Sequence, residues 1–239
     1  MNIELDSVAK SYHLNAGDNT KDFDNLFHQM CLHWIQPMVL ESKVILQLGY
    51  GEGLLASALI SADAKMDIVE GSSVLAEHAK NKLPENVFVH NNLFEDFHPS
   101  SRYDCIVATN VLEHVDDPVS LLESIYHWLK SDGIVIVSVP NAHSIHRQLA
   151  VEMGIQSSIY DLSERDHLVG HQRVYDMATL IDQVQAAGFR IRERRGFVLK
   201  VVSNAQQNSF SEELINAFHT ISPLLAPELL ANIGLVLTK

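Results

Sequence analysis

The sequence predicts an α/β fold in which helices cover both faces of a doubly wound, mostly parallel sheet. From Val44 onward, short apolar runs alternate with segments of helical periodicity, which is the pattern of a parallel sheet buried on both sides. The first apolar run ends in Gly49, Gly51 and Gly53, and the next one closes with Glu70. A glycine-rich turn followed one strand later by an acid is how such sheets bind a nucleoside.

Each element follows from this alternation. The expected strands are Val44–Leu48, Met66–Glu70, Val87–His90, Asp104–Thr109, Gly133–Val139, Phe189–Arg194 and Gly234–Thr238. The expected helices are Gly53–Ala62, Ser73–Lys82, Pro118–Leu129, Ser144–Glu152 and Met177–Ala187, with further helical spacing over Ser211–Asn232 that breaks at Ser222-Pro223. Asp116 and Asp117 are good cap and first-turn residues for the helix at Pro118, and Gly188 is a helix stop.

The chain is expected to form one domain over residues 1–239, because no internal repeat or low-complexity segment appears. Residues 1–42 are expected to be an N-terminal helical flap. The apolar residues of this segment recur at helical spacing, which is typical of a packed face. They are Phe23, Leu26, Phe27, Met30 and Trp34.

Charge and composition exclude several classes of partner. A net charge of −13 would repel a phosphate backbone, so no nucleic acid is expected, and we interpret the four arginines between residues 190 and 195 as a solvated strand face. No apolar run approaches the roughly 18 residues of a membrane span, and residues 1–10 lack the pattern of a secretory signal. Cys31 and Cys105 are expected to be reduced packing residues. We therefore expect a cytoplasmic protein that does not associate with a membrane.

The bound nucleoside is expected to carry no phosphates. The dinucleotide fingerprint needs its third glycine at the position of Leu54, and Gly53 comes one residue early. No triphosphate-binding loop pattern occurs, and no Lys or Arg between Val44 and Ala64 could meet a pyrophosphate. A nicotinamide-dependent dehydrogenase is therefore disfavoured.

An ordered set of motifs resembles the class I S-adenosylmethionine-dependent methyltransferases. The motifs are Gly49–Gly53, Asp67–Ser72, Tyr103–Asp104, Asn110–Pro118, Leu129–Gly133 and Ala187–Phe189. The resemblance implies a Rossmann-like sheet of seven strands whose last strand is antiparallel, and S-adenosylmethionine as the cofactor. We accordingly expect a cofactor-binding half over residues 43–139 and a substrate-side half over residues 140–239.

The resemblance also implies which residues hold the cofactor. Those near the methionine portion, the sulfonium and the ribose would be Gly49, Gly51, Gly53, Glu70, Gly71, Ser72, Asn110 and Val111. Glu70 would accept both ribose hydroxyls. At the adenine, Asn92 would meet the amino group, with Leu93 beside the ring.

Two positions depart from the family pattern. The family usually has an acid where this chain has Gln47, and its adenine position is more often Asp than Asn. An amide can hydrogen-bond but cannot attract the ammonium group of the cofactor as a carboxylate does. Three possibilities are left open. Cofactor binding is weaker, an acid such as Glu113 or Glu52 supplies the charge instead, or the chain is a noncatalytic S-adenosylmethionine-binding regulatory protein.

The acceptor side is expected to supply a general base. A sulfonium is an activated methyl donor, so the protein must chiefly align the acceptor, and a hydroxyl acceptor also needs a base. His143, which follows the fifth strand, is the first choice because a neutral imidazole can take a proton near neutral pH. His146, His167 and His171 are the alternatives.

Two segments on this side, Pro140-Asn141 and Gly170–Tyr175, resemble a methyltransferase subgroup in which they build one wall of the pocket. For His171, bracing this loop together with Arg173 and Tyr175 is the role that we favour over catalysis. The H-x-x-H spacing of His143 and His146 often arises by chance, and no cysteine accompanies it, so no catalytic metal is expected.

The expected function is S-adenosylmethionine-dependent methyl transfer to an oxygen or nitrogen of a small metabolite, with a sugar or a secondary metabolite as the expected class. A quinone-type ring O-methyltransferase is the alternative enzyme. The oligomeric state is left open between a monomer and a homodimer.

Overall fold

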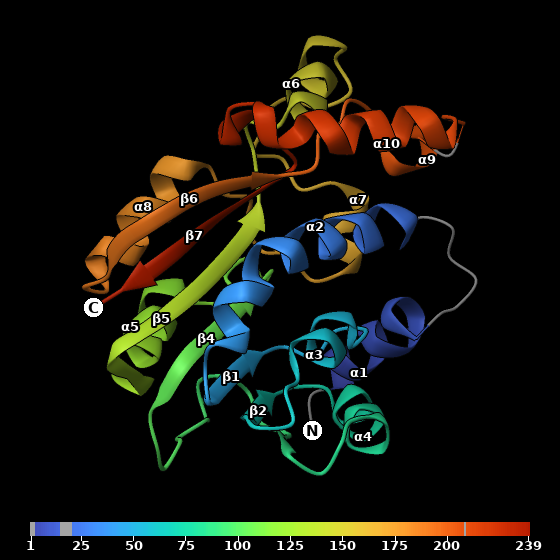
Figure 1. The fold of residues 1–239 in the computed structure, drawn as a ribbon. Helices are drawn as coiled ribbons and strands as arrows, with labels where there is room; N and C mark the ends of the chain where they lie inside the picture. Colours follow the sequence, from blue (N-terminus) through green and yellow to red (C-terminus); the bar gives the residue numbers. More distant parts are fainter. Residues whose placement is uncertain (1–2, 15–20, 208) are drawn as a thin grey trace.

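The computed structural model describes residues 3–14, 21–207 and 209–239, without the side chains of residues 3–4, 21–26 and 205. The described residues form a seven-stranded sheet with the strand order β3-β2-β1-β4-β5-β7-β6 (Figure 1). The strands are β1 Val44–Leu48, β2 Lys65–Val69, β3 Val87–His90, β4 Tyr103–Thr109, β5 Leu129–Pro140, β6 Arg190–Phe197 and β7 Asn232–Thr238. β1 to β5 pair in parallel, whereas β7 runs antiparallel to both β5 and β6. The predicted fold class is therefore confirmed.

Helices cover both faces of the sheet, because successive side chains of a strand point to opposite sides. Ile45 packs in the cluster that contains residues of α2 Lys21–Leu40, α3 Leu54–Leu59 and α4 Ser73–Lys82. Leu46 packs in the opposite cluster, with residues of α5 Pro118–Trp128 and α8 Met177–Ala186. The remaining helical elements are α1 Ile3–Val8, η1 Ala9–His13, α6 Ile145–Glu152, α7 Glu164–Leu168, α9 Asn204–Gln207, α10 Glu212–Ile221 and the short turns η2 Ser222–Leu224 and η3 Pro227–Leu229.

The helices follow the predicted caps in part, but α3 ends at Leu59 and not at Ala62, and α9 was not predicted. The Asp117 side chain accepts the backbone N–H of Ser120 at the start of α5, as expected. The predicted helical stretch over residues 211–232 is a helix only as far as Ile221, because Pro223 and Pro227 each begin a separate short turn. α7 was not predicted, although the Ser163 and Asp166 spacing that forms its capping box is visible in the sequence.

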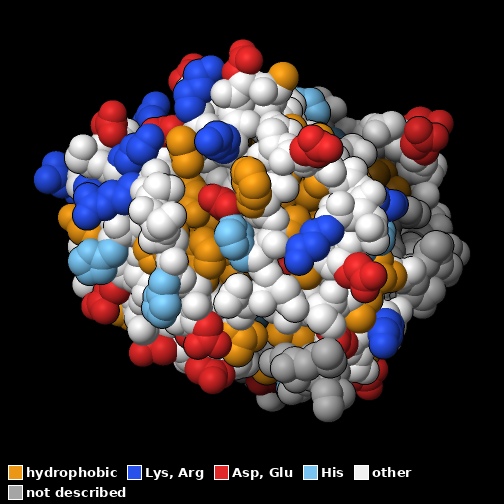
Figure 2. Space-filling view, turned by 90° about the horizontal axis from the view of Figure 1, so that it is seen from below, with side chains coloured by type: hydrophobic (Ala, Val, Ile, Leu, Met, Phe, Trp, Pro, Cys, Tyr) orange, Lys and Arg blue, Asp and Glu red, His pale blue; other side chains and the backbone are white. Residues whose placement is uncertain are grey.

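The edge strand β6 carries the basic cluster. Arg190, Arg192, Arg194 and Arg195 are exposed, which confirms their interpretation as a solvated strand face. On the face of the molecule drawn in Figure 2, Lys and Arg side chains gather toward the left edge with acidic side chains beside them. Charged side chains on an edge strand also disfavour pairing with a strand of another chain.

Packing predictions can be checked at the cysteines and the N-terminal helix. Cys31 and Cys105 are buried and free, as expected, and burial raises the pKa of each thiol to about 12. On α2, Phe27 and Trp34 pack against Phe197, while the side chains of the first two residues of the predicted apolar face lie outside the described residues.

In the described part of the chain, no helix combines the length and the apolar character that a membrane crossing requires.

Candidate functional site

A cavity of about 1360 Å³ lies at the carboxyl ends of the parallel strands. Its lining combines the turns after β1, β2 and β4 with residues of α1, η1, α6 and α7. Carboxyl ends of parallel strands meet at one edge of a sheet, where α/β proteins bind their ligands. Of the residues predicted to hold the cofactor, all but Asn92 line this cavity.

The glycine turn after β1 forms a backbone cradle. Gly49, Gly51 and Gly53 have φ values of +77°, +58° and +80°, which side-chain-bearing residues rarely adopt. A Cβ atom on Gly51 would have no neighbour within 4 Å, and one on Gly49 would meet Val111 at 4.0 Å. The backbone of both residues therefore faces open space, as the approach of a ligand requires.

Gly53 lines the cavity and also makes room for the side chain of Tyr50. A Cβ atom there would overlap the hydroxyl and ring of Tyr50. Tyr50 is 4% exposed and lines the cavity, and sequence reasoning did not select it, although a bulky aromatic residue between two glycines is an unusual choice. Glycine at position 53 is thus needed for the packing of Tyr50.

Glu70 occupies the predicted place beyond the end of β2. One carboxylate oxygen accepts the backbone N–H of Tyr50 at 2.9 Å, and the other accepts that of Ser72 at 2.8 Å. Burial raises the pKa of Glu70, and these two hydrogen bonds oppose the rise. Each oxygen keeps a second lone pair, so the side chain can accept ribose hydroxyls as well.

At the expected adenine end, Leu93 lines the cavity, whereas Asn92 is exposed and does not. The neighbouring Asn91 donates from its side chain to the carbonyl groups of Glu70 at 2.9 Å and Gly71 at 3.3 Å. Asn91 therefore holds the turn after β2, and the contact of Asn92 with adenine stays a prediction.

The expected methionine end of the cavity is lined by Gln47, Asn110 and Val111. Gln47 is buried and donates Nε2 to the Gly49 carbonyl at 2.8 Å, while its Oε1 has no hydrogen-bond partner. A buried unpaired carbonyl oxygen is costly unless a ligand supplies a donor. An ammonium group would supply one, so the residues present fit the cofactor that the sequence implies.

The four candidate bases lie in different places, and one of them, His167, lines the cavity from α7. His143 does not line the cavity: its half-exposed ring faces Asp176, with Nε2 and Oδ2 separated by 4.0 Å. His146 lines the cavity from α6, and burial lowers its pKa well below the usual value. His171 also lines the cavity, with Nδ1 2.9 Å from Oδ1 of Asp166.

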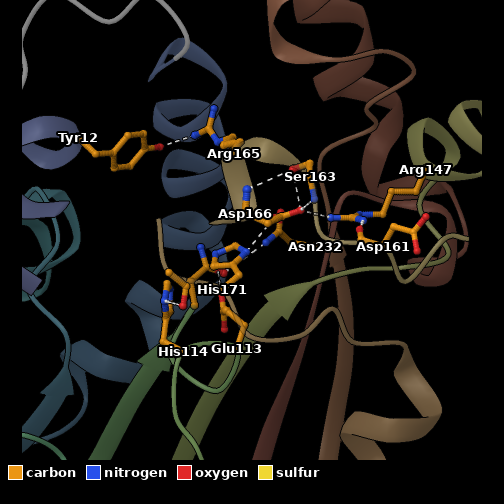
Figure 3. A network of polar contacts seen from close by, with 12 residues as sticks. Tyr12, Glu113, His114, Arg147, Asp161, Ser163, Arg165, Asp166, His171 and Asn232 are labelled. Atoms are coloured by element: carbon orange, nitrogen blue, oxygen red, sulfur yellow. Dashed lines mark hydrogen bonds and ion pairs between the residues drawn. The ribbon is translucent and has the colours of Figure 1, made fainter. Parts of the chain in front are cut away.

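Glu113, His114 and His171 form a cluster beside the cavity (Figure 3), in which His114 and His171 line the cavity and Glu113 is buried. Glu113 is fully buried, and neither carboxylate oxygen has a hydrogen-bond partner. Burial raises the pKa of Glu113 to about 7 and lowers the pKa of His114 to about 4. The ligand atoms of the three residues lie within 4.8 Å of one another, so the cluster has the geometry either to move a proton or to hold a divalent cation.

The two acceptor-side segments meet as the resemblance implied. Tyr175 donates its backbone N–H to Pro140 at 3.3 Å and accepts that of Ala142 at 2.6 Å. The Tyr175 hydroxyl and Arg173 donate to the carbonyl of Leu112 at 3.3 Å and 2.9 Å. Arg173 and Tyr175 therefore brace the loop against the segment after β4, while His171 faces the cavity.

Comparisons with known proteins bear on the family and the fold of this chain. A family model described as "Methyltransferase domain" matches residues 24–194. A ubiquinone biosynthesis O-methyltransferase of Actinobacillus pleuropneumoniae is 26% identical over 184 residues, which are 72% of this chain and 77% of that protein. A crystal structure of an S-adenosylmethionine-dependent methyltransferase from Thermotoga maritima, a possible histamine N-methyltransferase, has a TM-score of 0.65 at 19% identity, covering 98% of this chain and 99% of that one. One from Mesorhizobium loti has a TM-score of 0.64 at 14% identity, covering 90% and 99%.

Proposed function

Because the chain belongs to the class I S-adenosylmethionine-dependent methyltransferases, we propose that it methylates an oxygen or nitrogen of a small metabolite and that His171 takes the proton of the acceptor. The observation that carries this proposal is the position of His171. It lines the cavity, its Nδ1 lies 2.9 Å from Oδ1 of Asp166, and its Nε2 lies 4.0 Å from Oε1 of the buried Glu113.

We propose that residues 43–139 bind the cofactor and that residues 140–239 bind the acceptor. When bound, S-adenosylmethionine supplies a methyl group already activated by its sulfonium. The backbone of Gly49 and Gly51, the carboxylate of Glu70 and the Oε1 atom of Gln47 would hold it. The chain itself must align the acceptor, exclude water and accept a proton.

Exclusion of water is the task that we assign to the N-terminal flap. Arg165 of α7 donates to the Tyr12 hydroxyl of η1, and its guanidinium carbon lies 5.3 Å from the centre of the Tyr12 ring. This contact joins the flap to the acceptor side across the cavity that both line (Figure 3). The acceptor that we propose is a small one, such as a sugar or a secondary metabolite.

Ring O-methylation of a quinone-type acceptor is the second candidate. It is favoured by the curated relatives, which are named ubiquinone biosynthesis O-methyltransferases and are 24% to 26% identical to this chain. A hydroxyl on such a ring would use the same proton acceptor. The two candidates differ in the acceptor alone, and a cytoplasmic location is expected for either.

Calorimetry with S-adenosylmethionine, followed by a methyl-transfer assay on sugars, quinols, phenols and amines, tests the function. We expect binding and turnover with at least one acceptor class. Binding without turnover on any class would favour the regulatory alternative.

The role of His171 is tested by His171→Gln, which we expect to lower kcat by about 100-fold or more while leaving cofactor affinity unchanged. His143→Gln is the matched control, since His143 lies outside the cavity. The assay is also run with a chelator, because Glu113, His114 and His171 could hold a divalent cation. Loss of turnover with chelator and its recovery with Zn²⁺ or Mn²⁺, the cations that suit two imidazoles and a carboxylate, would assign His171 to cation binding and overturn its role as base.

A further inference from the structure

A second buried carboxylate lies behind His171, on the side away from Glu113 (Figure 3). Asp166 and Arg147 are each 7% exposed, and Nη2 of Arg147 donates to Oδ2 of Asp166 at 2.8 Å. The same Oδ2 atom accepts the backbone N–H of Ser163 at 2.8 Å and its hydroxyl at 2.7 Å. Three donors thus hold one oxygen and leave Oδ1 to His171.

This arrangement keeps Asp166 ionised. Burial opposes ionisation, but the hydrogen bond from His171 and the charge of Arg147 hold the pKa of Asp166 well below its usual range. An ionised carboxylate is an acceptor only. The hydrogen between Asp166 and His171 must therefore belong to Nδ1 of His171.

Asp166 also fixes the backbone around the ring. Its carbonyl accepts the backbone N–H of His171 at 2.8 Å, and the next residue, Gln172, donates its N–H to the carbonyl of Glu113 at 2.8 Å. The ring and the main chain of His171 are thus both held between α7 and the segment after β4. Rotation of the imidazole would break the contact between Nδ1 and Asp166.

Arg147 is held beside Asp166 by hydrogen bonds to the backbone. Its Nη1 atom donates to the carbonyl of Asp161 at 2.7 Å and to that of Ile159 at 3.4 Å. A buried ion pair is weak evidence for stability, because desolvation offsets much of its attraction. Fixed orientation of a third group, here His171, is a more specific consequence of such a pair.

We propose that Asp166, held by Arg147 and Ser163, is a positioning residue that fixes His171 with its hydrogen on Nδ1 and its free electron pair on Nε2, the atom that faces Glu113. The catalytic consequence rests on the proposed function, whereas the tautomer does not. With this tautomer, the acceptor proton can pass to Nε2. With the other tautomer, Nε2 carries hydrogen and cannot accept it.

The amide of an Asp166→Asn variant can donate to Nδ1, which would favour the tautomer with hydrogen on Nε2. Histidine labelled with ¹⁵N reports the tautomer in long-range ¹H–¹⁵N spectra, and the His171 signals are identified by their loss in His171→Gln. We expect hydrogen on Nδ1 in the wild-type chain. Hydrogen on Nε2 there would overturn the proposal, even if Asp166→Asn fails to fold.

Kinetics of the same variant give the second readout. For Asp166→Asn we expect kcat to fall by about 100-fold or more, with KM for the acceptor and Kd for S-adenosylmethionine within about twofold of wild type. Asp182→Asn, at an exposed position of α8, is the matched control.

The outcomes separate the two proposals. A wild-type chain without turnover on any acceptor overturns the proposed function, and the spectra still decide the tautomer. A wild-type chain with turnover whose Asp166→Asn variant keeps kcat within about threefold overturns the positioning role alone.

Discussion

The carboxylate of Glu70, just beyond β2, accepts the backbone N–H of Tyr50, just beyond β1, at 2.9 Å. Its other oxygen accepts the N–H of Ser72 at 2.8 Å, so one side chain joins the two turns that follow the first two strands. Since the ring of Tyr50 packs over Gly53, the shape of the cofactor end depends on contacts among these four residues.

Glu70→Ala should weaken S-adenosylmethionine binding, because the change removes the acceptor for the ribose hydroxyls and leaves two backbone donors unpaired. We expect a loss of roughly 1 to 3 kcal/mol, or about 5-fold to 150-fold in Kd. Calorimetry measures it, with Glu77→Ala on the exposed side of α4 as the matched control. Equal affinities for both variants would mean that the ribose lies elsewhere.

Gln47→Glu should tighten cofactor binding and destabilise the free protein. A carboxylate would attract the ammonium group of the cofactor, which we expect to contribute about 1 kcal/mol, or roughly fivefold in Kd. Without cofactor, the same carboxylate would replace the amide that now donates to the Gly49 carbonyl at 2.8 Å. Calorimetry and thermal unfolding check the two effects, and weaker binding would contradict the placement of the ammonium.

Gly53→Ala should lower the free energy of unfolding more than Gly51→Ala. Both residues have positive φ, which costs about 1 kcal/mol or more for alanine. At position 53 the new Cβ atom would also overlap Tyr50, whereas at position 51 it would meet no atom within 4 Å. Urea unfolding of both variants gives the comparison, and equal losses would show that Tyr50 moves aside freely.

Glu113→Gln should flatten the dependence of stability on pH. Burial raises the pKa of Glu113 from 4.5 to about 7, so the folded state binds this proton more tightly than the unfolded state. The free energy of unfolding therefore falls as pH rises from 4.5 to 7, by about 3 kcal/mol in total. The glutamine variant cannot ionise and should not lose this amount.

Urea unfolding at pH 5 and pH 8 tests the effect of Glu113→Gln. Glu123→Gln, at an exposed position of α5, is the matched control and should follow the wild-type chain. The prediction fails if all three proteins lose the same stability between the two pH values.

The candidate site shows where prediction from the sequence reached its limit. His143 was the first choice for the base because it directly follows β5, but its backbone N–H binds the Asn141 side chain at 3.0 Å and its ring faces Asp176. His171 enters the cavity instead, since Arg173 and Tyr175 anchor its loop to the carbonyl of Leu112. Position along the chain does not reveal such anchors.

The sequence by itself determined the alternation of strands and helices, the glycine turn and the acid at Glu70, because apolar periodicity and backbone freedom are local properties of neighbouring residues. Only the tertiary structure decided which of the 13 histidines line the cavity and which carboxylate orients His171. Asp166, Arg147 and Glu113 come from separate segments, and their burial and hydrogen bonds arise only when the sheet brings those segments together.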